Sequence, residues 1–188
     1  GRDLMAEDSR GPVQAPVVLH DDDPGATRYA TWLAEEFDTR ATHHDAADPA
    51  ELVVAGTVVL VTGMRPGGGL GGSAFIRDNW EALVEAGRRV AVVMVGPTPV
   101  TDDARIELMS SEFWSDQLRD LKLFQLRGVV TPDQLGFRQR LGIKTALAAL
   151  RRKTDRTPEE ESMLELGGLD LTDRVSLGPL LRWIRREA

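Results

Sequence analysis

Short apolar runs that alternate with helical patterns limit the fold of this chain more than any other feature. The runs lie at Val17–Leu19, Thr57–Gly63, Arg88–Gly96 and Lys122–Val130, and a weaker one lies near Arg40–His44. Such runs are typical of strands buried on both faces, as parallel sheets require. Because helical patterns follow them, the sequence predicts a doubly wound α/β sheet with right-handed crossovers, in three layers.

The helical patterns differ between the two halves of the chain. Helices are expected between the strands at Ala26–Phe37, Ser73–Ala86 and Thr101–Leu118. Thr101 is a good N-cap, followed by acidic residues in the first turn. Beyond Val130 the pattern is helical alone, with helices expected over residues 131–153, from Thr157 onward, and over residues 173–186. Thr157 and Glu160 have the spacing of a capping box.

Composition excludes several classes of function. The formal net charge of -7 argues against affinity for nucleic acid, and the absence of cysteine excludes disulfides and thiolate sites. No apolar run approaches the roughly 20 residues that span a bilayer, so we expect no stable membrane insertion and a cytoplasmic protein. The 188 residues fit one domain at residues 17–188. The polar segment 1–16 is expected to be disordered, and residues before Met5 are consistent with an expression remnant.

Three adjacent carboxylates, Asp21, Asp22 and Asp23, stand where the first strand gives way to the first helix. In one interpretation Asp23 is the N-cap, Pro24 is the first helical residue, and the other two carboxylates face water. In another, one carboxylate has a pKa raised by its neighbours and is a general acid or base. Metal binding fits less well, because three consecutive residues do not converge easily on one ion. No metal site is predicted.

Five other side chains are candidates for the same site or are set aside from it. His20 precedes the triplet and could carry a proton, although a lone histidine at a strand end is more often structural. His43 and His44 follow the weak second strand and are expected to face solvent. Arg65 is the only cation of the glycine-rich loop and could bind an anionic substrate group. Trp114, expected on a helix, could cover a planar ligand.

The segments HDDDPGATRYATWLAEEF, LFQLRGVV, LGFRQRLGIKTALAALRRK and RTPEEESML carry a resemblance to a known family. With the order of elements, they resemble the flavodoxin-domain family that includes menaquinone-dependent protoporphyrinogen oxidase. The resemblance covers the chain from about Val17 to its end. It implies a flavodoxin-like fold with strand order 2-1-3-4-5, extra C-terminal helices, and FMN at the carboxyl ends of the strands.

The chain departs from this family at the cofactor site. The family's first loop reads approximately Ala-Ser-Lys-Tyr-Gly-Ser-Thr and surrounds the FMN phosphate at a helix N-terminus. Of that loop only Gly25 and Thr27 are retained, and the acidic triplet replaces the residues before them. Gly67 and Gly96 are further candidate cofactor contacts. Gly67 lies in a glycine-rich loop that also departs from the family and is either a flexible connection or a loop that closes over a ligand, and Gly96 ends a strand. Because two like charges about 5 Å apart repel by roughly 3 kcal/mol at a dielectric near 20, we expect no tightly bound FMN.

Three hypotheses for the function follow. The first is an enzyme on a flavodoxin-like scaffold that uses the acidic cleft for acid–base chemistry on a small molecule. The second is an FMN-dependent oxidoreductase similar to the protoporphyrinogen oxidases, with the phosphate held by backbone N–H groups. The third is a non-catalytic binding module. The fold does not decide among them, because function depends on the site.

Overall fold

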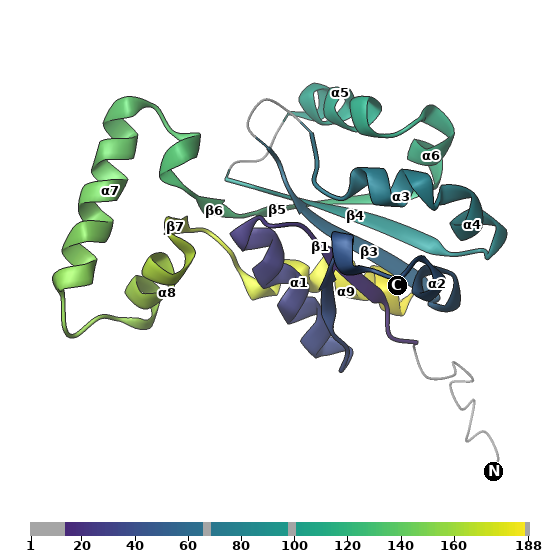
Figure 1. Cartoon of the computed structure of the whole chain (residues 1–188), viewed down its shortest axis with the longest axis horizontal. Helices are drawn as coiled ribbons and strands as arrows, with labels where there is room; N and C mark the ends of the chain where they lie inside the picture. The colour runs from purple at the N-terminus through teal and green to yellow at the C-terminus, as the bar shows by residue number, and fades with distance from the viewer. Residues whose placement is uncertain (1–13, 66–68, 98–100, 187–188) are drawn as a thin grey trace, which may run out of the picture.

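A parallel sheet of five strands forms the centre of the computed structural model, which describes residues 14–65, 69–97 and 101–186. The strands are β1 (Val17–His20), β2 (Ala41–His43), β3 (Thr57–Gly63), β4 (Arg89–Gly96) and β5 (Leu121–Arg127). Their order is β2-β1-β3-β4-β5, and all four pairings are parallel (Figure 1). Both the doubly wound α/β prediction and the flavodoxin-like strand order are confirmed.

Apolar residues fill both faces of the central strands, which explains why the sequence located them well. All seven residues of β3 are buried, and so is every residue of β4 after Arg89. Alternate side chains enter opposite layers: Val59 and Val61 belong to one core, while Val58 and Leu60 belong to the other. The side-chain period of a strand therefore divides one apolar run between two cores.

Helices cover both faces of the sheet, as the three-layer prediction requires (Figure 1). One layer holds α1 (Pro24–Glu36), η3 (Arg174–Leu177) and α9 (Gly178–Arg185), and Leu177, Leu180 and Ile184 pack there against Tyr29 and Leu33. The other layer contains η1 (His44–Ala46), α2 (Pro49–Val54), α3 (Ser73–Asp78), α4 (Trp80–Glu85), α5 (Asp102–Glu112) and α6 (Ser115–Asp120). Within the described ranges no helix has the length and apolar content needed to cross a membrane.

Several predicted elements are divided in the structure, including the helix expected over residues 131–153, which becomes η2 (Pro132–Gln134) and α7 (Phe137–Arg152). The helix expected at Ser73–Ala86 breaks at Asn79, whose side-chain amide donates to the Phe75 carbonyl at 2.8 Å. The helix expected at Thr101–Leu118 breaks at Phe113, which has an extended backbone and a buried ring. The last strand breaks at Gly128, where the main chain lies against the Val95 side chain and leaves the sheet.

The segment from Val129 to Asp170 projects from one side of the sheet, and we call it the C-terminal arm (Figure 1). It consists of β6 (Val129–Val130), η2 (Pro132–Gln134), α7 (Phe137–Arg152), α8 (Pro158–Leu166) and β7 (Leu169–Asp170). The predicted capping box of Thr157 and Glu160 is confirmed. The arm is fastened to α1 by Arg28, whose guanidinium donates to Asp170 at 2.5 Å and to Ser162 at 2.7 Å.

Candidate functional site

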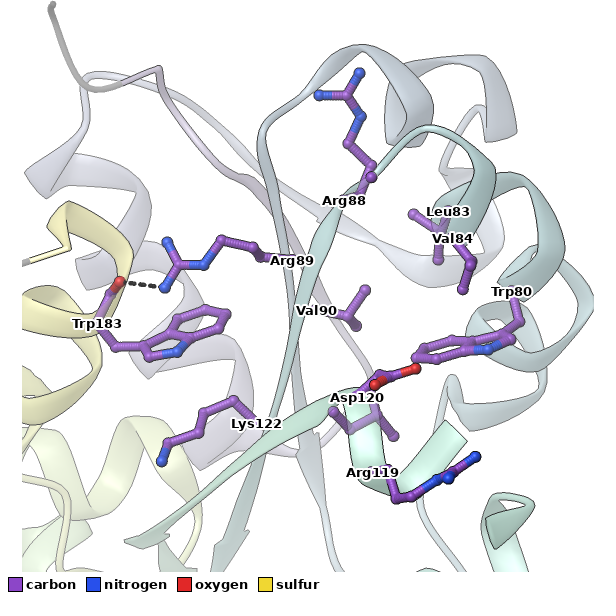
Figure 2. A pocket seen from close by; sticks show the side chains of 12 residues that line it. Trp80, Leu83, Val84, Arg88, Arg89, Val90, Arg119, Asp120, Lys122 and Trp183 are labelled. Carbon is purple, nitrogen blue, oxygen red and sulfur yellow. Dashed lines mark hydrogen bonds between the residues drawn. The ribbon is translucent and has the colours of Figure 1, made fainter. Parts of the chain in front are cut away.

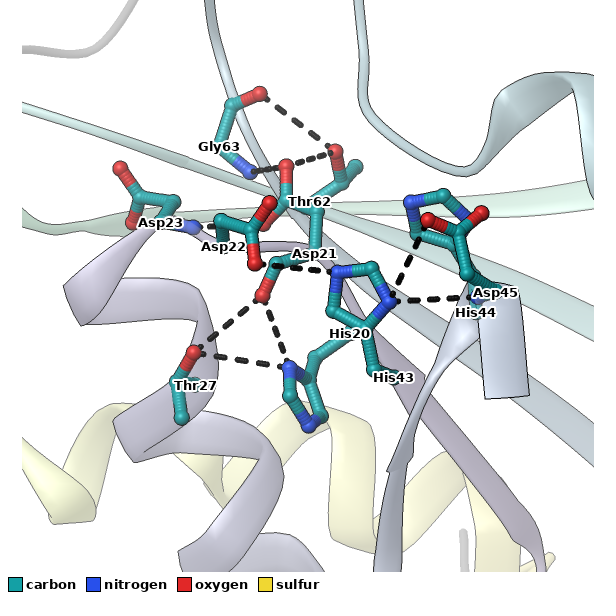
Figure 3. Close-up of polar contacts among 10 residues, drawn as sticks. All are labelled: His20, Asp21, Asp22, Asp23, Thr27, His43, His44, Asp45, Thr62 and Gly63. Atoms are coloured by element: carbon teal, nitrogen blue, oxygen red, sulfur yellow. Dashed lines mark hydrogen bonds and ion pairs between the residues drawn. The ribbon is translucent and has the colours of Figure 1, made fainter. Parts of the chain in front are cut away.

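All three histidines of the chain lie together at the carboxyl ends of β1 and β2 (Figure 3). The parallel register pairs His20 with His43, and His44 follows directly. The His20 and His43 rings meet edge to face, with centroids 5.6 Å apart, and the His43 and His44 rings stack at 4.5 Å. The side chains of His43 and His44 are only 25% and 15% exposed. The expectation that they face solvent is therefore wrong, because strand pairing places them against the first loop.

Hydrogen-bond partners assign the protons on two of these rings. His20 Nδ1 lies 2.8 Å from the Asp21 carbonyl oxygen, so Nδ1 carries a proton, and in a neutral His20 the lone pair is on Nε2. His43 Nδ1 accepts from the Asp45 backbone N–H at 3.2 Å, so the proton of a neutral His43 is on Nε2. That Nε2 lies 3.2 Å from Asp22 Oδ1, although the contact lacks the angles of a hydrogen bond. The cluster thus places imidazole rings next to carboxylates.

Asp21 is buried, with only 5% of its surface exposed. Its Oδ2 accepts from Thr62 Oγ1 and from the Gly63 backbone N–H, both at 3.0 Å, and its Oδ1 accepts from the Asp23 backbone N–H at 3.1 Å. These donors satisfy the carboxylate and fix it between β1 and β3. The interpretation that Asp21 faces water is wrong for this residue, because the carboxyl ends of adjacent parallel strands converge on it.

Asp22 and Asp23 have opposite surroundings. The Asp22 side chain is 97% exposed, as expected for a water-facing carboxylate. Asp23 is the N-cap of α1 and Pro24 is the first helical residue, as that interpretation predicts. Asp23 Oδ1 accepts from the Ala26 backbone N–H at 2.8 Å. Burial raises the pKa of Asp23 and the negative charge of Asp21 adds to the rise, against the opposing hydrogen bond from Ala26.

Glycines allow the neighbouring segments to approach these carboxylates. A Cβ atom at Gly63 would lie 2.4 Å from the Asp23 Cβ, and one at Gly71 would lie 2.4 Å from Asp21 Oδ2. Gly72 has a φ of +80° and lies against the His44 ring. The first loop and the end of the glycine-rich loop are therefore in contact, as a shared site requires. Gly67 lies outside the described residues.

Two hollows open at the end of the sheet where the carboxyl ends of the strands lie, which we call the carboxyl edge. Arg65 lines both hollows. The smaller, of about 240 Å³, is lined by Asp21, Asp22, Asp23, Gly63, Met64, Arg65 and Gln134. The larger, of about 540 Å³, includes His44, Asp45, Arg65, Ser73 and Glu112 in its lining. Arg65 lies between them, so the predicted substrate-binding cation is in contact with both hollows.

Other predicted site residues have structural contacts or lie elsewhere. Thr27 Oγ1 donates to the Asp21 carbonyl at 3.2 Å, and Gly25 packs closely against Gly128. Gly96 accepts from the Gly128 backbone N–H at 2.8 Å and lines neither hollow. Trp114 is the N-cap of α6, is 71% exposed and also lines neither hollow. The geometry does not bring Trp114 to the carboxyl edge.

Sequence reasoning missed several residues of the site. His43, His44 and Asp45 join it through the pairing of β1 with β2, and β2 has only three residues, too few for a period to be seen. Gln134 reaches the smaller hollow from the C-terminal arm, and its side chain completes a capping box with Thr131. The helix expected over residues 131–153 began at this turn, but the sequence did not place the turn beside Asp22.

A third hollow, also of about 540 Å³, lies at the opposite end of the sheet, where strands β4 and β5 begin (Figure 2). We call this end the amino edge. Its charged lining residues are Arg88, Arg89, Arg119, Lys122 and Asp120, and Trp80 and Trp183 contribute indole rings. The Arg89 guanidinium lies 4.0 Å from the Trp183 ring centroid and donates to the Trp183 carbonyl at 2.6 Å. Ligands of open α/β sheets bind outside the carboxyl ends of the strands, so this hollow is not the first candidate.

No protein-family model matches the sequence, and no curated protein matches it. Among solved structures, the chain is similar to the Trp repressor binding protein from Bacillus subtilis, with a TM-score of 0.43 and 15% sequence identity. The match covers 75% of this chain and 99% of that chain. At this level the likeness carries no argument about function. No match supports the closer resemblance to menaquinone-dependent protoporphyrinogen oxidase, and what remains is the flavodoxin-like topology.

Proposed function

We propose that this chain is an acid–base enzyme that acts on a small polar molecule at the carboxyl edge of the sheet, without tightly bound FMN. The observation that carries the proposal is the position of Asp23. Its carboxylate caps α1 where related folds hold a phosphate, and it also lines the smaller hollow. A carboxyl group with a raised pKa in a hollow is a typical general acid or base.

The residues at the start of α1 do not fit an FMN phosphate. The Ala26 backbone N–H, one of the donors that a phosphate would use, already donates to Asp23. The Thr27 hydroxyl already donates to the Asp21 carbonyl at 3.2 Å. A phosphate dianion would also face three carboxylates, each repelling it by roughly 3 kcal/mol per unit charge at about 5 Å and a dielectric near 20, before screening. The Asp23 carboxylate thus occupies the position at the helix N-terminus that a phosphate has in related folds.

The contacts suggest separate roles for the surrounding side chains. Asp23 Oδ1 is held by the helix cap, and Oδ2 can therefore hold or release the transferred proton. Asp21, enclosed by Thr62 and Gly63, positions the loop and raises the pKa of Asp23 through its charge. His20 donates through Nδ1, so in its neutral form Nε2 is a second candidate proton acceptor. Arg65 would bind an anionic group of the substrate.

A two-step experiment tests the proposal. Small polar metabolites are first screened for an increase in the melting temperature of the wild-type protein, and ligands found in this way are then followed by NMR for chemical change. We expect turnover by the wild type and none by Asp23→Asn, which keeps a good N-cap and the fold. Asp38→Asn, remote from the site, is the control and should retain turnover. Ligands that bind but are never changed would favour the binding module.

Titration with FMN tests the second half of the proposal. We expect no saturation in the low micromolar range when quenching of flavin fluorescence is followed. Sub-micromolar affinity would contradict the proposal and favour the FMN-dependent oxidoreductase.

A further inference from the structure

We propose that His43, His44 and Asp45 form a binding site for a first-row divalent transition ion of the zinc class. One possible ligand atom from each of these three residues lies within 4.8 Å of the other two. They follow one another at the end of β2, where the chain turns into η1. This site is separate from the acidic triplet, in which consecutive carboxylates diverge.

The Asp45 carboxylate faces both imidazoles (Figure 3). Its Oδ1 lies 3.1 Å from His44 Nδ1, and its Oδ2 lies 3.8 Å from His43 Nδ1. An ion with bonds of about 2.1 Å requires ligand atoms no more than about 4.2 Å apart. Both pairs with Asp45 satisfy this limit, and the ligand atoms of the two histidines lie within 4.8 Å of each other. The Asp45 side chain is 79% exposed and free to adjust. The ion would take the His43 Nδ1 lone pair that now accepts the Asp45 backbone N–H.

Asp22 has the position of an outer partner for this ion. A histidine that binds a metal through one ring nitrogen usually donates its other N–H to a carboxylate, which fixes the tautomer. His43 Nε2, which is shielded from solvent and has no well-formed hydrogen bond, lies 3.2 Å from Asp22 Oδ1. The His20 ring also contacts the His43 ring edge to face. When an ion is bound to His43 Nδ1, the Nε2–H group of His43 would donate a hydrogen bond to Asp22.

Charge and position favour a dication and give it access to a ligand. Two imidazoles with a carboxylate suit zinc, cobalt, nickel or iron better than magnesium or calcium, which prefer oxygen ligands alone. Asp22 and Asp45 supply negative charge beside the site. His44 and Asp45 also line the larger hollow, which contains Arg65. The fourth coordination position of a bound ion would therefore face that hollow.

The test uses the full chain without a histidine tag, first stripped with a chelator. Zinc binding is measured by calorimetry, and cobalt is used to observe the visible absorption of an ion with nitrogen ligands. We expect one ion per chain with micromolar affinity, falling at least ~10-fold in His44→Gln and in Asp45→Asn. Asp22→Asn should weaken binding less. Glu51→Gln, an exposed carboxylate on α2, removes the same charge as Asp45→Asn and should leave the affinity unchanged.

Two outcomes would overturn the proposal. One is the absence of one-to-one binding in the micromolar range by the folded wild type. The other is binding that survives both His44→Gln and Asp45→Asn, since the ion would then be held elsewhere. Circular dichroism melting verifies that the variants fold, and exposed Asp45 is the safer position if His44→Gln unfolds. Because no substrate is used, the result is independent of the acid–base proposal.

Discussion

The two ends of the sheet present opposite chemistry, with the acidic residues after β1 and β2 at one end and the basic residues at the starts of β4 and β5 at the other. At the carboxyl edge, Asp21, Asp22, Asp23 and Asp45 gather around three histidines, with Arg65 as the cation lining both hollows. At the amino edge, Arg88, Arg89, Arg119 and Lys122 surround two tryptophans, with Asp120 as the acid in the lining. Asp21 and Asp23 at the carboxyl edge are fixed by hydrogen bonds from backbone N–H groups, whereas Arg89 is fixed by stacking and by carbonyls of α9. Although the net charge is -7, the charged side chains of these two regions are unevenly distributed, with acidic residues at the carboxyl edge and basic residues at the amino edge.

The largest effect is expected from removing the buried carboxylate of the carboxyl edge. Asp21→Ala leaves Thr62 Oγ1 and the Gly63 and Asp23 N–H groups without their acceptor, so the free energy of unfolding should fall by about 2–4 kcal/mol. Urea denaturation in the absence of added metal measures it. Asp22→Ala removes an equal charge from an exposed side chain and should change the free energy by no more than ~0.5 kcal/mol. Equal losses in the two variants would disprove the structural role assigned to Asp21.

At the amino edge, Arg89→Ala should have a smaller effect. It removes stacking on Trp183 and hydrogen bonds to the Trp183 and Ile184 carbonyls, for an expected loss of about 1–2 kcal/mol. Tryptophan fluorescence should change as well, because the Trp183 ring loses the guanidinium that stacks on it. Lys122 lines the same hollow, so Lys122→Ala is the control and should cause almost no loss in the free energy of unfolding. A loss of stability in Lys122→Ala as large as in Arg89→Ala would show that charge, and not stacking, stabilises this edge.

Reversing charge at the carboxyl edge should remove its repulsion of an anionic ligand such as FMN and make its charge more like that of the amino edge. Asp22→Lys combined with Asp23→Ser keeps an N-cap and removes repulsion, so affinity for FMN should rise ~10-fold at low salt and less at high salt. Flavin fluorescence quenching measures this change. Asp120→Lys adds positive charge at the other edge and should not change the affinity. An equal rise in Asp120→Lys would mean that flavin binds among the arginines instead.

The smallest effect concerns Asp23 and pH. Because its pKa is raised in the folded state, the ionised form costs stability at neutral pH, and this cost disappears as the pH falls through the folded pKa. Asp23→Asn caps the helix equally well and should melt at the same or a slightly higher temperature at neutral pH. The difference should shrink in acid. A variant that melts well below the wild type at neutral pH would show that the charge stabilises the loop.

The sequence predicted the fold well wherever one local signal decides the structure. Thr57–Gly63 is a strand with the predicted bounds because every residue in it is buried, and Thr101 and Thr157 are N-caps because their side chains bond within their own helices. The breaks at Phe113 and Gly128 could not be predicted, since packing against distant residues causes them. The same limit applies to the site. The N-cap role of Asp23 is local, whereas the histidine cluster depends on a three-residue strand pairing in one register.

Gln134 links the smaller hollow to the C-terminal arm, which is anchored through Arg28 and Asp170. Any ligand that contacts Gln134 must bind more tightly when the arm is docked, and thermodynamic reciprocity then requires that ligand to favour the docked arm by the same factor. Burial alone would raise the pKa of Asp170, but hydrogen bonds from Thr172 and Ser162 and the charge of Arg28 together lower it. Acid therefore weakens this anchor. Affinity at the hollow should consequently decline in acid even for a ligand with no titrating group of its own.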